Sequence, residues 1–505
     1  MQDRRKALQV LTLNTLAFTV CFAAWMTNGV LVTFLVDNGL YDWDKVQIGW
    51  LIGIPVLTGS ITRLPVGILT DRFGGRRVYT LLMLLSALPM FLLSYADSYA
   101  EFALAGLGFG LTGASFAVGI AYTSVWFAPR NKGTALGVFG AGNAGAALTS
   151  MGAPLLIRRL TSTDAGLEGW RQLPRLYALG LAVTAVLFWF LTFERRASSA
   201  DGKSLGQQLA VLGRMRVWRF GLYYFFVFGG FVALAQWLIP YYVNVYEVTL
   251  ATAGMLAAIF TLPSGVIRAL GGWMSDRLGA RTVMYLVLGV SAGACALLIV
   301  PRMDIQAPGQ GIMATRAGVV TSVTEDRIEL DGIVVPLVAR PAHTITLRND
   351  DDTLIWPNFE FWQEPSVTVG QTVKRRDLLA RGVTHIYFQA NVWVFTALVF
   401  GLGIAMGIGK AAVYKHIPDY FPDEVGVVGG VVGVLGGLGG FVCPILFGYM
   451  LQYTGIWTTN WMFFLAVTVA CLAWMHLVVR RMMRAEVPDL VRHIEHAATE
   501  PKAGR

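Results

Sequence analysis

The segment from Arg63 to Arg77, R-L-P-V-G-I-L-T-D-R-F-G-G-R-R, ends a long apolar run and has a second copy that begins at Arg268. The second copy reads R-A-L-G-G-W-M-S-D-R-L-G-A-R-T. At one offset of 205 residues, without a gap, the identical pairs are Arg63 and Arg268, Gly67 and Gly272, Asp71 and Asp276, Arg72 and Arg277, Gly74 and Gly279, and Arg76 and Arg281. Such identities indicate two related halves, and internal duplication in a hydrophobic chain is typical of transporters.

The composition places these halves in a membrane. Of the 505 residues, 55% are hydrophobic and only 14% are charged, whereas soluble proteins carry about 25% charged residues. Apolar stretches long enough to cross a bilayer, at roughly 17–25 residues, predict an all-α membrane protein of twelve helices in two pseudo-symmetric six-helix halves. The expected spans are 8–36, 46–69, 78–97, 100–127, 134–157, 174–194, 217–245, 251–275, 283–301, 389–414, 425–451 and 460–480.

The distribution of charge predicts the topology. The net charge of +9 does not indicate nucleic-acid binding, because most basic residues lie in short loops on one side of the predicted spans. The positive-inside rule then places both termini in the cytoplasm of a multi-pass protein in the cytoplasmic (inner) membrane. The exceptions on the opposite side are Arg158, Arg159, Arg171 and Arg175. The four cysteines lie in apolar runs, so we expect no disulfide, metal or other cofactor.

The polar stretch 303–388 interrupts the second half. Its apolar residues alternate with polar ones between turn signals, which predicts short strands. We expect a small β-rich insert between helices nine and ten, outside the cytoplasm by parity; no partner for it follows from the sequence. The expected order begins with an N-terminal six-helix half, 1–195, and a cytoplasmic linker, 196–216. The C-terminal half follows in two parts, 217–302 and 389–484, which the extracytoplasmic insert 303–388 separates. A cytoplasmic tail, 485–505, ends the chain.

Arg63 and Arg268 are candidate binding residues. Each lies two helical turns from the aspartate of its motif, about 12 Å along the axis, and a buried guanidinium is costly unless paired or hydrated. No carboxylate lies well inside a predicted span. An anionic substrate held by arginine forks from both halves is therefore the favoured interpretation. The alternative is that both arginines snorkel to the surface or donate to backbone carbonyls.

The glycine-rich spans five and eleven carry the most specific motifs. Span five contains A-L-G-V-F-G-A-G-N-A-G-A-A, with the polar Asn143 at its middle, and span eleven contains G-V-V-G-G-V-V-G-V-L-G-G-L-G-G-F from position 426. Glycine lowers helix stability by about 1 kcal/mol, so this density needs a reason, and close helix packing would explain most of it.

These two runs resemble the signatures of the nitrate/nitrite porter family of the major facilitator superfamily. The D-R-x-G-x-R turn resembles that superfamily's loop between helices two and three, and the resemblance covers all twelve spans but not the insert. It implies a gating and structural role for Gly67, Asp71, Arg72, Arg76, Gly272, Asp276, Arg277 and Arg281. It implies substrate binding by Arg63, Arg268, Asn143, Phe116, Tyr224 and Phe228.

Lys410, in G-I-G-K-A-A-V-Y-K of span ten, departs from the simple pattern of paired arginines. It could snorkel towards the cytoplasm, since Lys415 is close in sequence. It could instead be a third cation in the pathway and a possible coupling site.

The sequence predicts a secondary transporter that exchanges nitrate and nitrite by alternating access. A proton-coupled nitrate symporter and a facilitator for another small anion are the alternatives of the same class. A membrane sensor whose outer β domain binds the ligand is an alternative of another class. An enzyme is not expected, because the spans contain no nucleophile–base set and no metal-ligand cluster.

Overall fold

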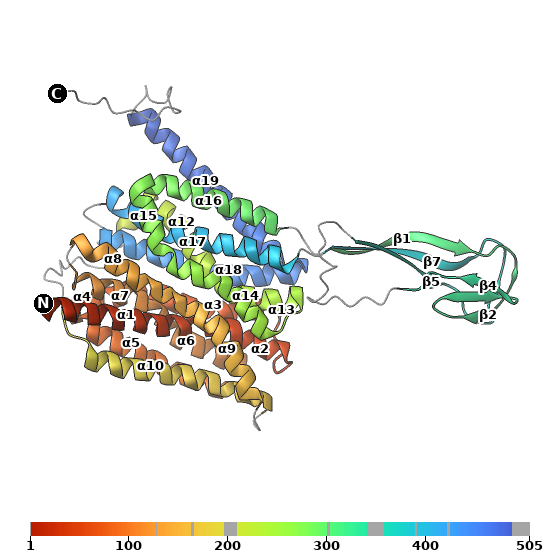
Figure 1. The fold of residues 1–505 in the computed structure, drawn as a ribbon, viewed down its shortest axis with the longest axis horizontal. Helices are drawn as coiled ribbons and strands as arrows, with labels where there is room; N and C mark the ends of the chain where they lie inside the picture. The colour runs from red at the N-terminus through yellow and green to blue at the C-terminus, as the bar shows by residue number, and fades with distance from the viewer. Residues whose placement is uncertain are drawn as a thin grey trace. The chain divides into compact units, whose positions relative to one another are not determined.

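The computed structural model of the protein describes residues 2–127, 129–162, 166–195, 210–299, 303–340, 358–388, 391–421 and 425–486. The chain divides into two compact units (Figure 1). One unit is helical and comprises Met1–Leu297 and Leu398–Arg505, and the other comprises Leu298–Ala397 and contains the β strands. The expected linker 196–216 and tail 485–505 lie largely outside the described residues.

The first half of the helical unit holds the first six predicted spans. Its elements are α1 (Gln2–Trp25), α2 (Thr27–Asp37), α3 (Lys45–Ile61), α4 (Arg63–Phe73), α5 (Gly75–Leu92), η1 (Leu93–Tyr95), α6 (Tyr99–Phe109), η2 (Gly110–Ala114), α7 (Ser115–Ser124), α8 (Pro129–Gly140), η3 (Ala141–Ala144), α9 (Gly145–Thr161), η4 (Gly166–Arg171) and α10 (Gln172–Leu191).

The second half holds the other six. Its elements are η5 (Ala210–Gly213), α12 (Met215–Tyr224), the π-helical turn η6 (Phe225–Gly230), α13 (Phe231–Tyr246), α14 (Leu250–Val266), α15 (Arg268–Leu278), α16 (Ala280–Leu298), α17 (Val392–Tyr420), α18 (Val425–Thr454) and α19 (Thr459–Glu486).

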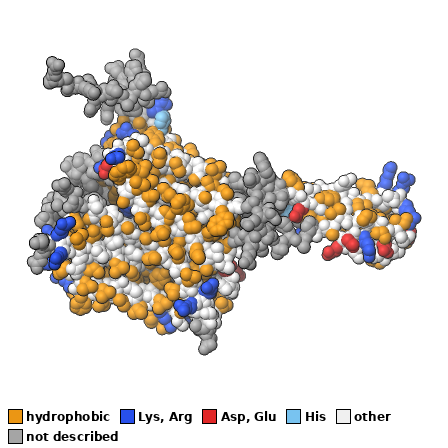
Figure 2. Space-filling model, viewed as in Figure 1, with side chains coloured by type: hydrophobic (Ala, Val, Ile, Leu, Met, Phe, Trp, Pro, Cys, Tyr) orange, Lys and Arg blue, Asp and Glu red, His pale blue; other side chains and the backbone are white. Residues whose placement is uncertain are grey.

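The helical fold class is confirmed, because every predicted span coincides with helical structure. Within the described residues, ten helices are long and apolar enough to cross a membrane, and the bent pair α14–α15 makes eleven. The glycine-rich segment from α8 to α9 is not among them. Hydrophobic side chains cover most of the described part of the helical unit's visible face (Figure 2), as expected of a surface that faces lipid.

The two halves break their second helices at equivalent positions. The first break lies at Thr62, between α3 and α4, and the second at Ile267, between α14 and α15. These positions are again 205 residues apart, and the second pair is bent by 46°. Pro65 follows the first break and Pro263 precedes the second; a proline removes a backbone donor and kinks a helix. Each break makes the candidate arginine the first residue of the next helix.

The glycines of the D-R-x-G-x-R turns adopt positive φ angles. Gly74 has φ +89° and Gly279 has φ +81°, in the region that residues with a Cβ rarely adopt. Each glycine lies between two helices, α4 and α5 in the first half and α15 and α16 in the second. The turns therefore reverse the chain within one residue.

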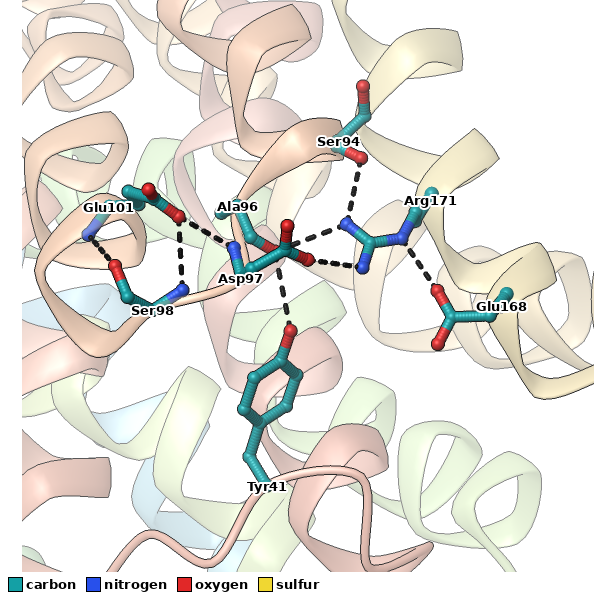
Figure 3. A network of polar contacts seen from close by, with 8 residues as sticks. All are labelled: Tyr41, Ser94, Ala96, Asp97, Ser98, Glu101, Glu168 and Arg171. Carbon is teal, nitrogen blue, oxygen red and sulfur yellow. Dashed lines mark hydrogen bonds and ion pairs between the residues drawn. The ribbon is translucent and has the colours of Figure 1, made fainter.

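Arg171 stabilises the connection between α5 and α6 in the first half. It donates to the carbonyl oxygens of Ser94 and Ala96 at 3.2 Å each and pairs with Asp97 and Glu168, both at 2.6 Å (Figure 3). Its neighbour Arg175 donates to the Ser94 hydroxyl. These arginines, which departed from the expected charge distribution, hold the connection between α5 and α6 against η4 and α10.

The second unit confirms the predicted β-rich insert. Strands β1 (Met303–Met313), β7 (Leu378–Phe388) and β5 (Asn358–Pro365) form an antiparallel sheet in that order. A second antiparallel sheet has the order β4 (Ile333–Pro336), β3 (Arg327–Leu330), β2 (Gly318–Val323) and β6 (Thr372–Val373). A small core of buried apolar residues, among them Ile328 and Leu379, supports it.

Candidate functional site

Arg63 and Arg268 approach the same aromatic ring from opposite halves of the helical unit. The guanidinium carbon of Arg63 lies 5.6 Å from the centroid of the Phe116 ring, and that of Arg268 lies 5.2 Å from it. Phe116 is buried in the second position of α7. Two cations that share one ring define the centre of the candidate site, because the negative face of the ring attracts each of them.

The two guanidinium groups are only partly satisfied. Arg63 donates from Nε to the carbonyl of Gly113 at 3.3 Å and from Nη1 to that of Gly433, in the other half, at 3.0 Å. The alternative in which backbone carbonyls hold this arginine is thus partly realised. Arg63 Nη2 and Arg268 Nη1 are nevertheless buried without a hydrogen-bond partner. Within the described part of the chain, neither arginine forms an ion pair, so donors remain for an anion.

Phe228 and Tyr224 line Arg63 from the second half. The Phe228 ring lies 4.7 Å from the Arg63 guanidinium carbon and stacks on Tyr224, with centroids 5.0 Å apart and planes at 4°. Phe228 also stacks on Phe116 across the two halves at 6.3 Å. Phe228 lies within the π-helical turn η6 and Tyr224 directly precedes it, and such turns are frequent at functional sites.

The glycines of α18 make room for these side chains. A Cβ at Gly436 would lie 2.1 Å from a ring carbon of Tyr224, and one at Gly437 would lie 2.4 Å from the Ser60 hydroxyl oxygen. Other glycines of the same helix are less crowded: a Cβ at Gly430 would meet its nearest atom at 3.6 Å. Part of the glycine density in span eleven therefore serves the site, and the remainder serves general helix packing.

Asn143 lies in the short turn η3 that interrupts span five, where the sequence placed the middle of one helix. It is fully buried; its Nδ2 donates to the Gly140 carbonyl at 3.0 Å, and its Oδ1 has no partner. Gly140 packs next to Arg268, since a Cβ there would lie 3.4 Å from Arg268 Cδ. The structure thus brings the glycine signature of span five against the second arginine.

Lys410 does not snorkel in this structure. Its side chain is fully buried in α17, and Nζ donates to the hydroxyl of Ser264 at 3.0 Å and to the Ser264 carbonyl at 3.3 Å. Nζ also lies 3.2 Å from the centroid of the Phe231 ring. Ser264 lies four residues before Arg268, on the other side of the break at Ile267. The charge of Arg268 acts on the Lys410 ammonium, so the lysine is a third cation beside the second arginine.

The structure adds Tyr414 and Trp25, which sequence reasoning missed. Tyr414 contacts Tyr224 edge-on at 5.0 Å, lies 5.7 Å from the Arg268 guanidinium carbon and donates to the Gly429 carbonyl. Its spacing of four residues from Lys410 places both on one helix face and could have indicated it. Trp25 lies 5.7 Å from the Arg63 guanidinium carbon, and no sequence signal distinguishes it from other core aromatics.

The residues to which the resemblance gives a gating and structural role lie in the two D-R-x-G-x-R turns and in the helices beside them, α4, α5, α15 and α16. A Cβ at Gly67 or at Gly272 would meet no atom within 4 Å. Asp71 is exposed and has no hydrogen bond or ion pair to a described residue. Asp276 pairs with Lys415 at 2.7 Å.

The four arginines of the two turns make local contacts. Arg72, Arg76 and Arg277 stack on Phe73, Trp189 and Trp273, and Arg281 donates to the Tyr420 hydroxyl at 3.0 Å. Each of these partners belongs to the same half as its arginine. In this structure the arginines of the turns therefore stabilise their own half.

The two halves are in close contact where α3 packs against α18. A Cβ at Gly49 of α3 would lie 2.5 Å from the Pro444 carbonyl oxygen of α18, and one at Gly448 would lie 2.5 Å from the Lys45 carbonyl oxygen. Helices from the two halves therefore touch backbone to backbone at the start of α3, whereas Gly67 and Gly272, near the turns, make no such approach.

Comparison with known proteins identifies relatives of the whole chain. The family model described as Major Facilitator Superfamily matches residues 13–324 and 378–501. A probable nitrate/nitrite antiporter, NarK1, of Thermus thermophilus is 38% identical over 99% of this chain and 98% of its own. A nitrite extrusion protein of Bacillus subtilis is 29% identical over 61% of this chain and 76% of its own.

The fold resembles solved transporters of low sequence identity. A bacterial homologue of the human lysosomal transporter Spinster, in an inward-facing and occupied conformation, has a TM-score of 0.61 at 14% identity and covers 93% of this chain and 96% of its own. The nucleoside transporter NupG has a TM-score of 0.58 at 12% identity, over 93% and 98%. At this identity the likeness concerns the fold alone.

Gly436→Ala tests whether the glycine of α18 shapes the site. The added methyl group would displace the Tyr224 ring, so we expect nitrate, the anion that the sequence resemblance implies, to bind at least about tenfold more weakly, the equivalent of about 1.4 kcal/mol. Binding is measured by titration of the purified protein. Gly430→Ala, on the same helix, is the matched control and should bind as the unchanged protein does. Equal affinity in both variants would contradict the packing argument.

Proposed function

Because the chain belongs to the nitrate/nitrite porter family of the major facilitator superfamily, we propose that it moves nitrate and nitrite across the cytoplasmic membrane by alternating access. The observation that carries the proposal is the pair Arg63 and Arg268. One arginine comes from each half, both face Phe116, and each keeps a buried unpaired nitrogen. Rocking of the halves around this pair would present a bound anion to each side in turn.

The chemistry of the site suits a small planar anion. Nitrate and nitrite are flat and carry their charge on oxygen atoms, so guanidinium forks can meet their edges while aromatic rings pack against their faces. Phe116 and Phe228 provide such faces in nearly parallel planes, 24° apart. A site built this way favours a monoanion of low hydration, and it contains no described carboxylate that would compete for the arginines.

The charge balance favours exchange. An empty site leaves Arg63, Arg268 and Lys410 close together without a described acidic partner, and like charges in a poorly polarisable interior repel. A bound anion removes part of that repulsion, so the loaded site reorients more readily than the empty one. We infer that nitrate enters as nitrite leaves.

A proton-coupled symporter is the second candidate, and Lys410 is the observation that favours it. Its ammonium group is fully buried and hydrogen-bonded only to Ser264 among the described residues. Lysine is a side chain whose charge responds readily to burial. A lysine that released its proton between the two facing states would couple nitrate uptake to a pH gradient.

Arg63→Lys and Arg268→Lys test the arginine pair. Lysine keeps the positive charge but loses the planar fork, so we expect each variant to lose at least about 100-fold in nitrate affinity, the equivalent of about 2.7 kcal/mol. Both variants should give monodisperse purified protein. Arg480→Lys, at an exposed position of α19, is the control for the substitution itself. Wild-type affinity in either variant would remove the pair from the binding site.

Uptake into proteoliposomes separates exchange from symport. With nitrite or nitrate inside the vesicles, exchange predicts rapid entry of labelled nitrate and little dependence on an imposed pH gradient. With neither anion inside, exchange predicts uptake near background. Robust uptake into empty vesicles that follows the pH gradient and disappears in Lys410→Ala would instead establish symport with the lysine as coupling residue.

The insert and both termini are proposed to lie on opposite sides of the membrane, with the termini in the cytoplasm. The four native cysteines are buried, so a single introduced cysteine reports its own side. We expect Glu325→Cys in the insert to react with an impermeant maleimide in intact cells, and Arg77→Cys in the first turn to react only after permeabilisation. The reverse pattern would invert the topology.

A further inference from the structure

A basic pocket lies in the helical unit, and none of the residues assigned to nitrate lines it. It lies between α12, α16, α17 and α19, is partly open, and leaves about 20 Å³ accessible to water. Arg281 belongs to the second D-R-x-G-x-R turn, so the cavity lies at that end of the second half. Its polar lining consists of Arg219, Tyr223, Arg281, His416 and Tyr420.

The cavity carries positive charge without a matching negative one. Arg219 is only 6% exposed, and Arg281 donates to the Tyr420 hydroxyl at 3.0 Å, an interaction that leaves its charge unbalanced. Within the described residues, Arg219 and Arg281 form no ion pair with a carboxylate. A buried arginine without a counter-charge is costly in a membrane protein. The described residues provide no carboxylate for this pair, so a bound anion would lower that cost.

Two neutral groups of the lining also lack partners. The Nε2 atom of His416 and the hydroxyl of Tyr223 are buried and make no hydrogen bond to a described residue, and their residues are 6% and 1% exposed. The His416 ring is fixed by stacking on Phe220, with centroids 5.5 Å apart and planes at 8°. Buried polar atoms are seldom left unsatisfied. The Tyr223 hydroxyl can donate to an acceptor as the arginines do, and so can His416 Nε2 in the tautomer that carries the proton there.

In the first half, the residues that correspond to Arg281 and its neighbour have different contacts. Arg76, which corresponds to Arg281, lies 4.5 Å from the centroid of the Trp189 ring, and its neighbour Arg77 faces the Glu194 carboxylate at 3.8 Å. The first half thus brings a carboxylate of its own to this place. At the position equivalent to Arg77 the second half has Thr282, and the carboxylate has no counterpart in the cavity lining.

We propose that this cavity binds a phosphate-type oxyanion, held by Arg219 and Arg281 with Tyr223 and His416 completing its hydrogen bonds. Arginine forks and neutral donors in one place suit a group with several acceptor oxygens. The space accessible to water, about 20 Å³, is that of roughly one water molecule, so the side chains of the lining would have to move apart to admit the group. The group is either free inorganic phosphate or the headgroup of an acidic phospholipid. It would hold the end of α19 against α12 and α17.

The test uses the full-length protein, purified in detergent and stripped of lipid, in nitrate-free buffer. Binding of inorganic phosphate is measured by calorimetric titration and binding of phosphatidylglycerol by native mass spectrometry. Arg219→Gln and His416→Gln should each weaken binding at least about tenfold, while Arg480→Gln, an exposed position of α19 with the same charge change, should not. If Arg219→Gln does not give monodisperse protein, His416→Gln decides, because it removes no charge.

Binding of phosphate alone identifies the free ion as the ligand, and binding of the lipid alone identifies the headgroup; either supports the cavity. No binding of either probe to the unchanged protein, or binding that survives both substitutions, overturns the proposal. Arg63→Lys should leave phosphate binding unchanged. Failure here and failure of the nitrate site are therefore distinguishable, since each is measured with its own anion and its own variants.

Discussion

The repulsion between two arginines at the joint of two helical halves is the constraint on which the rest of the helical unit depends. Arg63 and Arg268 share the Phe116 ring, and within the described residues no carboxylate pairs with either. A low-polarity interior amplifies that repulsion. Carbonyl oxygens accept hydrogen bonds from Arg63, aromatic rings face both guanidinium groups, and some of their nitrogens remain unpaired among the described residues. Each of these devices moderates the charge without cancelling it.

Backbone shape makes this arrangement possible. Helix breaks at Thr62 and Ile267 place an arginine at the start of α4 and of α15, and the π-helical turn η6 directs Phe228 towards Arg63. Gly436 leaves room for the Tyr224 ring. Regular helices would have spread these side chains around several faces. The irregular segments and the glycines bring them to one place, at the cost of local helix stability.

The two halves are alike in sequence but not in electrostatics. The first half gives Arg77 a carboxylate, Glu194, and fixes its loops with Arg171. The second half places Arg219 and Arg281 around a pocket whose described lining contains no carboxylate, and it adds Lys410 beside Arg268. An inherited two-fold repeat has thus acquired different charge patterns, so the movements of the two halves need not be energetically equivalent.

The sequence by itself determined the spans, the duplication, the β-rich insert and the choice of Arg63 and Arg268, because hydropathy, period and repeated motifs are local properties of the chain. Through resemblance to a family it also singled out Asn143, Phe116, Tyr224 and Phe228 as candidate binding residues. Only the tertiary structure decided that Lys410 is held by Ser264 and does not snorkel, that Tyr414 and Trp25 border the arginines, and that Gly67 and Gly272 stand free. Those facts depend on contacts between segments far apart in the chain, which no local pattern encodes.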